Sequence, residues 1–166
     1  MTPIATSDTT QQFLSFLLPP DIQALLPTQQ VIEILNLTSH QIVPIAQVPP
    51  EVLGVCNWRG EVLWLVDLAA LIGTQVSPNR LCDSAYRPLQ LHTIVVQHKG
   101  YVLGLVVEQI GAILRQDTSE TYPILATPNP LQFAGCIEGC WLTPEGKSQW
   151  LLNGEALIEG FCLRRE

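Results

Sequence analysis

The stretch GVCNWRGEVLWLVDLAALIG, residues 54–73, decides most about the fold of this chain. Its central part, EVLWLV (61–66), shows almost no polar alternation, and this pattern predicts a strand that is buried on both faces. Asp67 follows as a typical N-cap of a short helix, LAALI (68–72), and Gly73 is a typical residue to end that helix. The stretch therefore predicts a buried strand that runs directly into a capped helix.

One cation, Arg59, interrupts this apolar stretch between Trp58 and Gly60. It could be an ordinary exposed side chain in a turn. Alternatively, the turn holds the guanidinium at a fixed place beside the indole, where its five donors could clamp backbone carbonyls or a partner's carboxylate. Arginine and tryptophan are also enriched at binding hot spots. The residues alone leave both interpretations open.

The rest of the chain consists of short apolar runs separated by turn residues, as is typical of a barrel or a sandwich. Two of these runs are joined by the compact turn HKG (98–100), in which glycine supplies the positive φ angle of a hairpin. We predict a mostly β chain of eight to ten strands, with EVLWLV joined by FLSFLL (13–18), QVIEIL (30–35), QIVPIA (41–46), LHTIVVQ (91–97), YVLGLVVEQI (101–110), GAILRQ (111–116), FAGCIEGCWL (133–142) and SQWLLN (148–153).

Two more short helices are expected beside the one at 68–72. VPPEVLGV (48–55) has proline near its start and Gly54 near its end, and this order predicts one helical turn. NGEALIEG near the end of the chain predicts a helix that Asn153 opens and Gly160 closes.

A polar, proline-containing loop over 74–89 separates two groups of strands of similar length, which suggests two small barrels. TSETYPILATPNP (118–130) is a second loop. We expect a disordered lead-in at residues 1–10, a single domain at 11–163 and a short tail at 164–166.

Composition narrows the class of function. Of the 166 residues 47% are hydrophobic and only 14% are charged, and the net charge of −7 would repel nucleic-acid phosphates. No window offers the roughly 18 uninterrupted apolar residues of a membrane span. The N-terminus lacks the pattern of a signal peptide, so we expect a cytoplasmic protein that neither binds nucleic acid nor inserts into a membrane.

No motif for catalysis, metal or cofactor stands out. The carboxylates form no common motif, the three histidines are scattered, and phosphate-binding glycine loops are absent. The five cysteines are expected to be free thiols, since neither a disulfide framework nor zinc spacing is present: Cys56, Cys82, Cys136, Cys140 and Cys162. An alternative function is a small β-barrel protein that binds a ligand or uses a thiol, either Cys56 near Arg59 or the pair Cys136 and Cys140.

The segment VPPEVLGVCNWRGEVLWLVDLAALIG (48–73) resembles a characteristic segment of CheW-type coupling proteins, with five matched residues: Asn57, Arg59, Gly60, Asp67 and Leu68. FLSFLL and QVIEIL resemble the preceding strands of that family. TIVVQHKGYVLGLVVEQIGAIL resembles its hairpin, and WLLNGEALI its closing strand and helix. The resemblance covers about residues 11 to 163.

This resemblance implies two intertwined, five-stranded SH3-like β-barrels with a few short helices, and no catalytic activity. It further implies an adaptor that binds the regulatory domain of a CheA-type histidine kinase and the cytoplasmic tip of methyl-accepting chemoreceptors. Through these partners the protein would join receptor arrays. The pathway could be chemotaxis, phototaxis or pilus-driven motility.

In the family, receptors bind in the groove between the barrels. Carried over to this chain, the partner-binding residues are Val31, Glu33, Arg59 and Val107. We predict that Asn57, Trp58 and Gly60, in the same turn as Arg59, also take part in partner binding. Arg59 could instead tie the two barrels together and affect partners indirectly.

The chain also departs from the family pattern at three places. Trp58 replaces an aliphatic residue, so it could pack in the seam between the barrels or alter the surface for a particular partner. Asn153 replaces the aspartate that usually opens the closing helix. The segment PPDIQALLPTQQ (19–30) is rich in proline and leucine and could form a helical turn.

Overall fold

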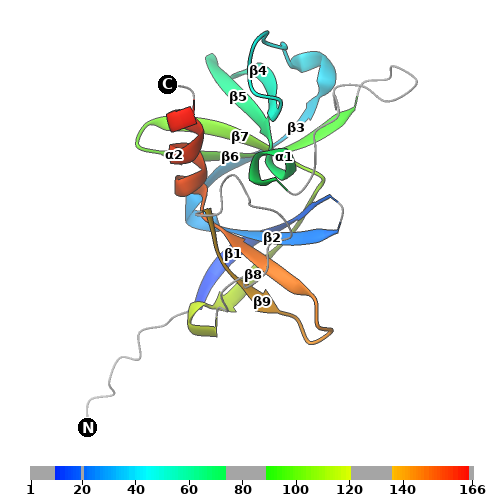
Figure 1. The fold of residues 1–166 in the computed structure, drawn as a ribbon, viewed down its shortest axis with the longest axis vertical. Coiled ribbons are helices and arrows are strands. Elements are labelled where there is room, and N and C mark those ends of the chain that lie inside the picture. The colour runs from blue at the N-terminus through cyan, green and yellow to red at the C-terminus, as the bar shows by residue number, and fades with distance from the viewer. Residues whose placement is uncertain (1–9, 20, 74–88, 121–135, 165–166) are drawn as a thin grey trace.

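The computed structural model describes residues 10–19, 21–73, 89–120 and 136–164. Within these ranges the chain forms two lobes, each built on a five-stranded sheet (Figure 1). The predicted lead-in apart from Thr10, nearly all of the loop at 74–89 and most of the loop at 118–130 fall outside the described residues.

The first sheet, which we call barrel A, combines strands from both ends of the chain. Its third and fourth strands run parallel to each other, and its other neighbours are antiparallel. The strand order is β8 (Gln109–Asp117), β1 (Thr10–Leu18), β2 (Ile22–Pro27), β10 (Ser148–Leu152) and β9 (Ile137–Leu142).

The second sheet, barrel B, contains the middle of the chain. Here β5 and β7 are the parallel neighbours. The order is β3 (Val31–Thr38), β6 (Gln90–His98), β7 (Tyr101–Val107), β5 (Glu61–Asp67) and β4 (Val52–Trp58). The ten strands confirm the predicted mostly β class and the two five-stranded barrels.

The division between the barrels is not where the loop at 74–89 suggested. That loop connects two elements of barrel B, whereas the chain crosses from barrel A to barrel B after β2 and returns with β8. Strands from the two ends of the chain therefore share one barrel. This arrangement confirms the intertwining that the family resemblance implied.

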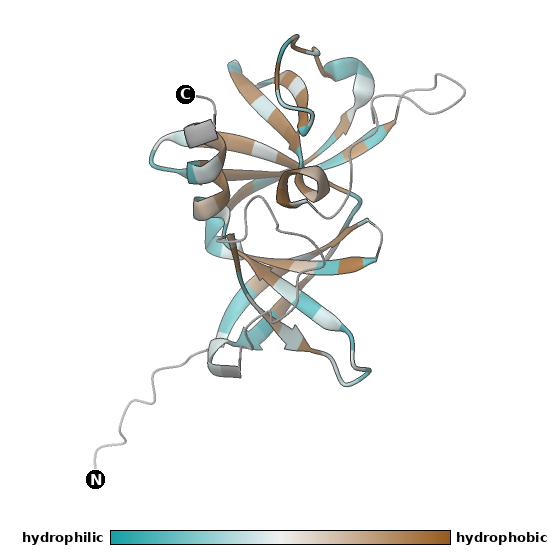
Figure 2. Cartoon of the chain, viewed as in Figure 1, coloured by the Kyte–Doolittle hydropathy of each residue, from teal (hydrophilic) through white to brown (hydrophobic). Residues whose placement is uncertain are grey.

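Most strands are apolar on both faces because each barrel has its own interior and also packs against a core shared between the two lobes. On β1, for example, Phe13 lies in the interior of barrel A, whereas Leu14 and Phe16 lie in the shared core. Figure 2 shows the resulting apolar strands, with polar residues at the hairpin turns.

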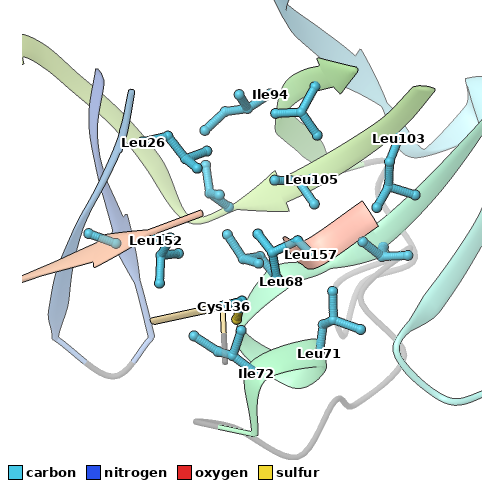
Figure 3. Packing of buried hydrophobic residues seen from close by; sticks show 14 of the residues in the cluster. Leu26, Leu68, Leu71, Ile72, Ile94, Leu103, Leu105, Cys136, Leu152 and Leu157 are labelled. Carbon is cyan, nitrogen blue, oxygen red and sulfur yellow. The ribbon is translucent and has the colours of Figure 1, made fainter. Parts of the chain in front are cut away.

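The same arrangement buries both faces of the second half of the strand predicted at 61–66, whereas Val62 near its start is 70% exposed. Leu63 and Leu65 fill the interior of barrel B, and Val66 faces the shared core. Figure 3 shows that the shared core draws its side chains from both sheets and both helices, including Leu26, Leu68, Leu105, Leu152 and Leu157.

Helix α1 (Leu68–Ile72) follows the prediction at both of its ends. The Asp67 carboxylate accepts a hydrogen bond from the Ala70 N–H at 3.4 Å, and Gly73 ends the helix in the left-handed region with φ 87°.

Helix α2 (Gly154–Arg164) begins after Asn153, as predicted, but it does not end at Gly160. Phe161 is buried in the shared core just beyond that glycine, and this packing continues the helix past a residue of low helix propensity. Gln30, at the crossover between the barrels, caps the helix by accepting the Gly154 N–H at 2.7 Å. The helix packs against β6 and β7 of barrel B (Figure 1).

Two predicted elements around residue 45 are wrong. The strand predicted at 41–46 is reduced to one bridge, between Val43 and Val55, because Pro44 has no N–H to continue a ladder. The segment at 48–55 forms no helix: a turn, in which the Pro49 carbonyl accepts the Val52 N–H at 3.0 Å, leads directly into β4. Gly54 adopts a φ of 145° there, and an added Cβ would lie 2.3 Å from the Val43 carbonyl oxygen. The glycine thus permits a close backbone approach and ends no helix.

The segment at 19–30 also differs from the expected helical turn. It contains β2, which pairs with β1 on one side and with β10 on the other. Only its last three residues are helical, in a 3-10 turn. The three 3-10 turns of the described chain are η1 (Thr28–Gln30), η2 (Ser39–Gln41) and η3 (Thr118–Glu120).

Candidate functional site

The turn that carries Arg59 is a tight two-residue hairpin connection between β4 and β5. Trp58 pairs with Glu61, and the two residues between them, Arg59 and Gly60, have φ angles of 52° and 78°. Positive φ at both central positions is the pattern of a type I′ turn. The Asn57 side-chain oxygen accepts the Gly60 N–H at 3.0 Å, which helps to fix this turn.

Arg59 and Trp58 converge on one carboxylate oxygen of Glu33. The indole Nε1 of Trp58 donates to Glu33 Oε2 at 2.9 Å, and Arg59 Nη2 donates to the same oxygen at 3.0 Å. The guanidinium also lies over the indole ring, with its Cζ 4.7 Å from the ring centroid, within cation–π distance. The side chain of Arg59 is 62% exposed and that of Glu33 is 34% exposed. The arginine is therefore fixed on one side and open to solvent on the other.

This cluster joins the two edges of one barrel. Glu33 lies on β3 and the turn follows β4, and these are the first and last strands of the sheet of barrel B. A matching contact is present in barrel A, where the Trp141 indole on edge strand β9 donates to the Asp117 carbonyl on edge strand β8 at 3.2 Å. Among the described residues, the contacts of Arg59 thus lie within barrel B and do not tie the two barrels to each other.

Trp58 does not lie in the seam between the barrels either. Its indole packs against the interior cluster of barrel B, together with Leu35, Leu89 and Val102. Its polar edge points to the carboxylate described above. The tryptophan thus covers an apolar core and orients the neighbouring arginine.

Two predicted site residues belong to a different part of the molecule. Val107 is 3% exposed within the shared core, and Val31 is partly buried against the same core. Glu33 is the only one of these three that reaches the Arg59 turn. The described structure therefore brings together Asn57, Trp58, Arg59, Gly60 and Glu33, and places the two valines apart from them.

Neither predicted thiol alternative gains support from the geometry. Burial raises the pKa of the Cys56 thiol, so its nucleophilic thiolate becomes less available. Burial likewise raises the pKa of Cys136 to about 12. Cys56, Cys136 and Cys140 are free, which confirms the expectation for these three cysteines.

The residues that the structure describes contain no group of three or more His, Cys, Asp or Glu side chains placed to hold a metal ion. No helix within the described ranges is long and apolar enough to cross a membrane.

Sequence reasoning placed Glu33 in the site through the family resemblance, but it missed the contact that makes Glu33 important. The indole of Trp58 and the carboxylate of Glu33 are 25 residues apart, on strands that are not neighbours in the sheet. No local pattern indicates such a contact, which depends on how the sheet curls.

Comparison with known proteins agrees with this architecture. A model of the CheW-like domain matches residues 12–161. The chemotaxis protein CheW of Rhizobium meliloti (strain 1021) is 36% identical over 81 residues, and this match covers 48% of the chain and 46% of that relative. The chain thus aligns with about half the length of that curated relative.

A solved structure shares this fold. The crystal structure of the scaffolding protein TtCheW from Thermoanaerobacter tengcongensis superposes with a TM-score of 0.68, covering 90% of this chain and 92% of that one. The sequence identity is 20%, so this likeness concerns the fold alone.

Proposed function

The chain belongs to the CheW-like family, and from that membership we propose that it is a non-catalytic adaptor in a chemotaxis-type signalling pathway. It couples the cytoplasmic tip of methyl-accepting chemoreceptors to the regulatory domain of a CheA-type histidine kinase. The pathway is chemotaxis, phototaxis or pilus-driven motility. The protein acts in the cytoplasm and reaches the membrane through its receptors.

The exposed guanidinium of Arg59 is the observation that carries a binding role. Within the described residues it donates one hydrogen bond, to Glu33, and its side chain is 62% exposed, so other N–H donors remain available to a partner. The type I′ turn and the indole beneath it reduce the conformational entropy that binding would cost. A fixed and still open arginine is suited to recognise a carboxylate or backbone carbonyls of a partner.

The other predicted residues support this turn in different ways. Asn57, Trp58 and Gly60 fix its geometry, and Glu33 holds the guanidinium. Val31 and Val107 pack in or against the shared core, where they influence the position of one barrel relative to the other. We propose that these two act on partner binding through that position.

Lys99 provides a matched control for testing Arg59. It occupies the same place in the β6–β7 hairpin, with a φ of 51° before Gly100, and its exposed ammonium lies 3.7 Å from one carboxylate, that of Glu159. Arg59→Ala should abolish co-purification of a receptor-tip fragment and a CheA-type kinase with this chain. Lys99→Ala should retain it.

Circular dichroism should show that both variants are folded. If Arg59→Ala assembles and activates the kinase as well as the unchanged chain does, the recognition role of Arg59 is wrong.

A further inference from the structure

At one mouth of barrel A, the neighbouring strands β2 and β10 carry the same residue types at paired positions. The proposed adaptor function does not use these residues. The parallel strands β2 and β10 pair Gln23 with Gln149 and Leu25 with Leu151. Two residues before the paired glutamines stand Asp21 and Lys147. Alternate residues of a strand share a face, so Gln23 and Leu25 lie on one face of β2, Gln149 and Leu151 lie on the same face of β10, and Asp21 and Lys147 precede the two strands.

The three glutamine side chains form a hydrogen-bonded series, with the buried Gln149 in the middle. Gln116 on β8 donates to Gln149 at 3.1 Å, and Gln149 donates to Gln23 at 3.1 Å. Gln149 is 7% exposed although its side chain is polar. Leu25 and Leu151 belong to the apolar interior of barrel A. Burial of an amide is favourable only while the amide is hydrogen-bonded, so these hydrogen bonds hold the glutamine side chains in fixed positions.

A cavity of about 400 Å³ opens at this mouth, beside the turn between β9 and β10. Figure 1 shows the β9–β10 hairpin projecting from the lower lobe. The cavity is lined by the acidic and the basic residue, the glutamine at the end of the hydrogen-bonded series, one indole and two aliphatic side chains: Asp21, Lys147, Gln23, Trp150, Leu17 and Ile22. This volume lies within the usual range for small-molecule sites.

The polar groups of this wall are open to a ligand. Within the described part of the chain, no ion pair or hydrogen bond engages the Asp21 carboxylate, the Lys147 ammonium or the half-buried Trp150 indole N–H. Ordinary surface charges are also often unpaired. Here, however, an acid and a base each stand two residues before one of the paired glutamines, and both line the same cavity as an indole and aliphatic side chains.

We propose that this mouth of barrel A binds a free α-amino acid with an apolar side chain. The ligand's ammonium pairs with Asp21, its carboxylate pairs with Lys147, and its side chain packs against Trp150 and Leu17. One group of each sign and an apolar wall complement the three parts of such a zwitterion. The site lies on barrel A, whereas the Arg59 turn lies on barrel B, so the adaptor could respond to a small molecule away from that turn.

L-leucine is a suitable probe, and the indole N–H signal of Trp150 in a ¹H–¹⁵N spectrum is a suitable readout. Its assignment follows from the signal that Trp150→Phe removes. We expect L-leucine to shift this signal and to saturate it at concentrations up to about 10 mM. Isopentylamine, which lacks the carboxylate, and 4-methylpentanoate, which lacks the ammonium, should each bind at least about tenfold more weakly.

Charge-removing variants test the two polar contacts separately. Asp21→Asn and Lys147→Gln should each weaken L-leucine binding by about tenfold or more. Glu145→Gln on the same hairpin and Lys99→Gln on barrel B should leave the affinity unchanged.

The absence of a saturable shift in the unchanged protein would overturn the proposal, and so would equal binding of the singly charged analogues. Unchanged affinity in both Asp21→Asn and Lys147→Gln would overturn it as well. Assembly with receptor and kinase is measured independently, so failure here and failure of the adaptor function are distinguishable.

Discussion

Replacing Glu33 by alanine should destabilise the chain, because one carboxylate oxygen joins both edges of barrel B. Glu33→Ala removes the acceptor of the Trp58 indole N–H and the anion beside Arg59 in a single step. The indole packs against the barrel interior, so its N–H is only partly able to find water as a replacement.

The two contacts differ in expected size. A hydrogen bond to a charged acceptor contributes about 1.5–3 kcal/mol, and partial exposure of Glu33 reduces this to roughly 1–1.5 kcal/mol for the indole. The arginine pair is more exposed and should contribute about 0.2–1 kcal/mol. The expected loss of about 2 kcal/mol corresponds to a fall of roughly 4–8 °C in Tm for a domain of this size.

A double-mutant cycle of Glu33→Ala and Trp58→Phe isolates the indole contact, because changes in packing of the ring cancel. Urea unfolding should be followed by far-ultraviolet circular dichroism, since one variant lacks a tryptophan. A second cycle with Arg59→Ala measures the ion pair. At about 1 M salt the Arg59 coupling should disappear and the Trp58 coupling should persist.

A coupling energy between Trp58 and Glu33 below about 0.3 kcal/mol would refute this account. The stability effects of substitutions at sites that do not interact add to within about this value. An Arg59 coupling larger than the Trp58 coupling would also contradict it. Either result would mean that the indole contact does not close the barrel.

Three further predictions concern backbone geometry and titration. Gly54→Ala should destabilise the chain by more than about 2 kcal/mol in urea unfolding, since its Cβ would meet the Val43 carbonyl and its φ is 145°; a loss below about 0.5 kcal/mol would contradict the close approach. Because the pKa of Cys136 is raised to about 12, the unfolded thiol ionises first, so stability should fall as the pH rises above about 8.5, and Cys136→Ala should flatten that slope. The pKa of Glu159 is lowered by its hydrogen bond with His98, so its small contribution to stability should be present above about pH 4.3 and be lost as the pH falls further. Glu159→Gln should remove this dependence of stability on pH. If stability measured against acid pH is the same in the variant, that result would argue against the contact.

The elements that the sequence predicts well are those specified by neighbouring residues. Asp67 and Gly73 mark both ends of α1 because an N-cap and a left-handed C-terminal residue act within one turn of the helix. The Lys99–Gly100 turn is similarly local, and its pairing of His98 with Tyr101 follows from a two-residue connection.

The errors occur where distant backbone decides the structure. Gly54 is a reasonable helix end by local criteria, but its conformation follows from contact with Val43 on another segment. β2 is a strand because β1 and β10 pair with it from both sides, although its proline and leucine content suggests a turn. The loop at 74–89 has the composition of a domain boundary, but which strands share a barrel depends on the crossovers.

The candidate site shows the same limit. The Arg59 turn was found from its residues, since Gly60 and the flanking strands mark a hairpin. Its contact with Glu33 depends on how the sheet of barrel B curls. The burial of Val107 in the shared core depends on how the two barrels pack.

The most direct test of the central claim is a bridging experiment with purified components. A receptor-tip fragment on beads, a CheA-type kinase and this chain should be combined, with each component omitted in turn. The account predicts that the kinase is retained on the receptor beads only when this chain is present, and that its autophosphorylation rate then changes. If the kinase is retained equally without the chain, or if the chain binds neither partner, the adaptor function is contradicted.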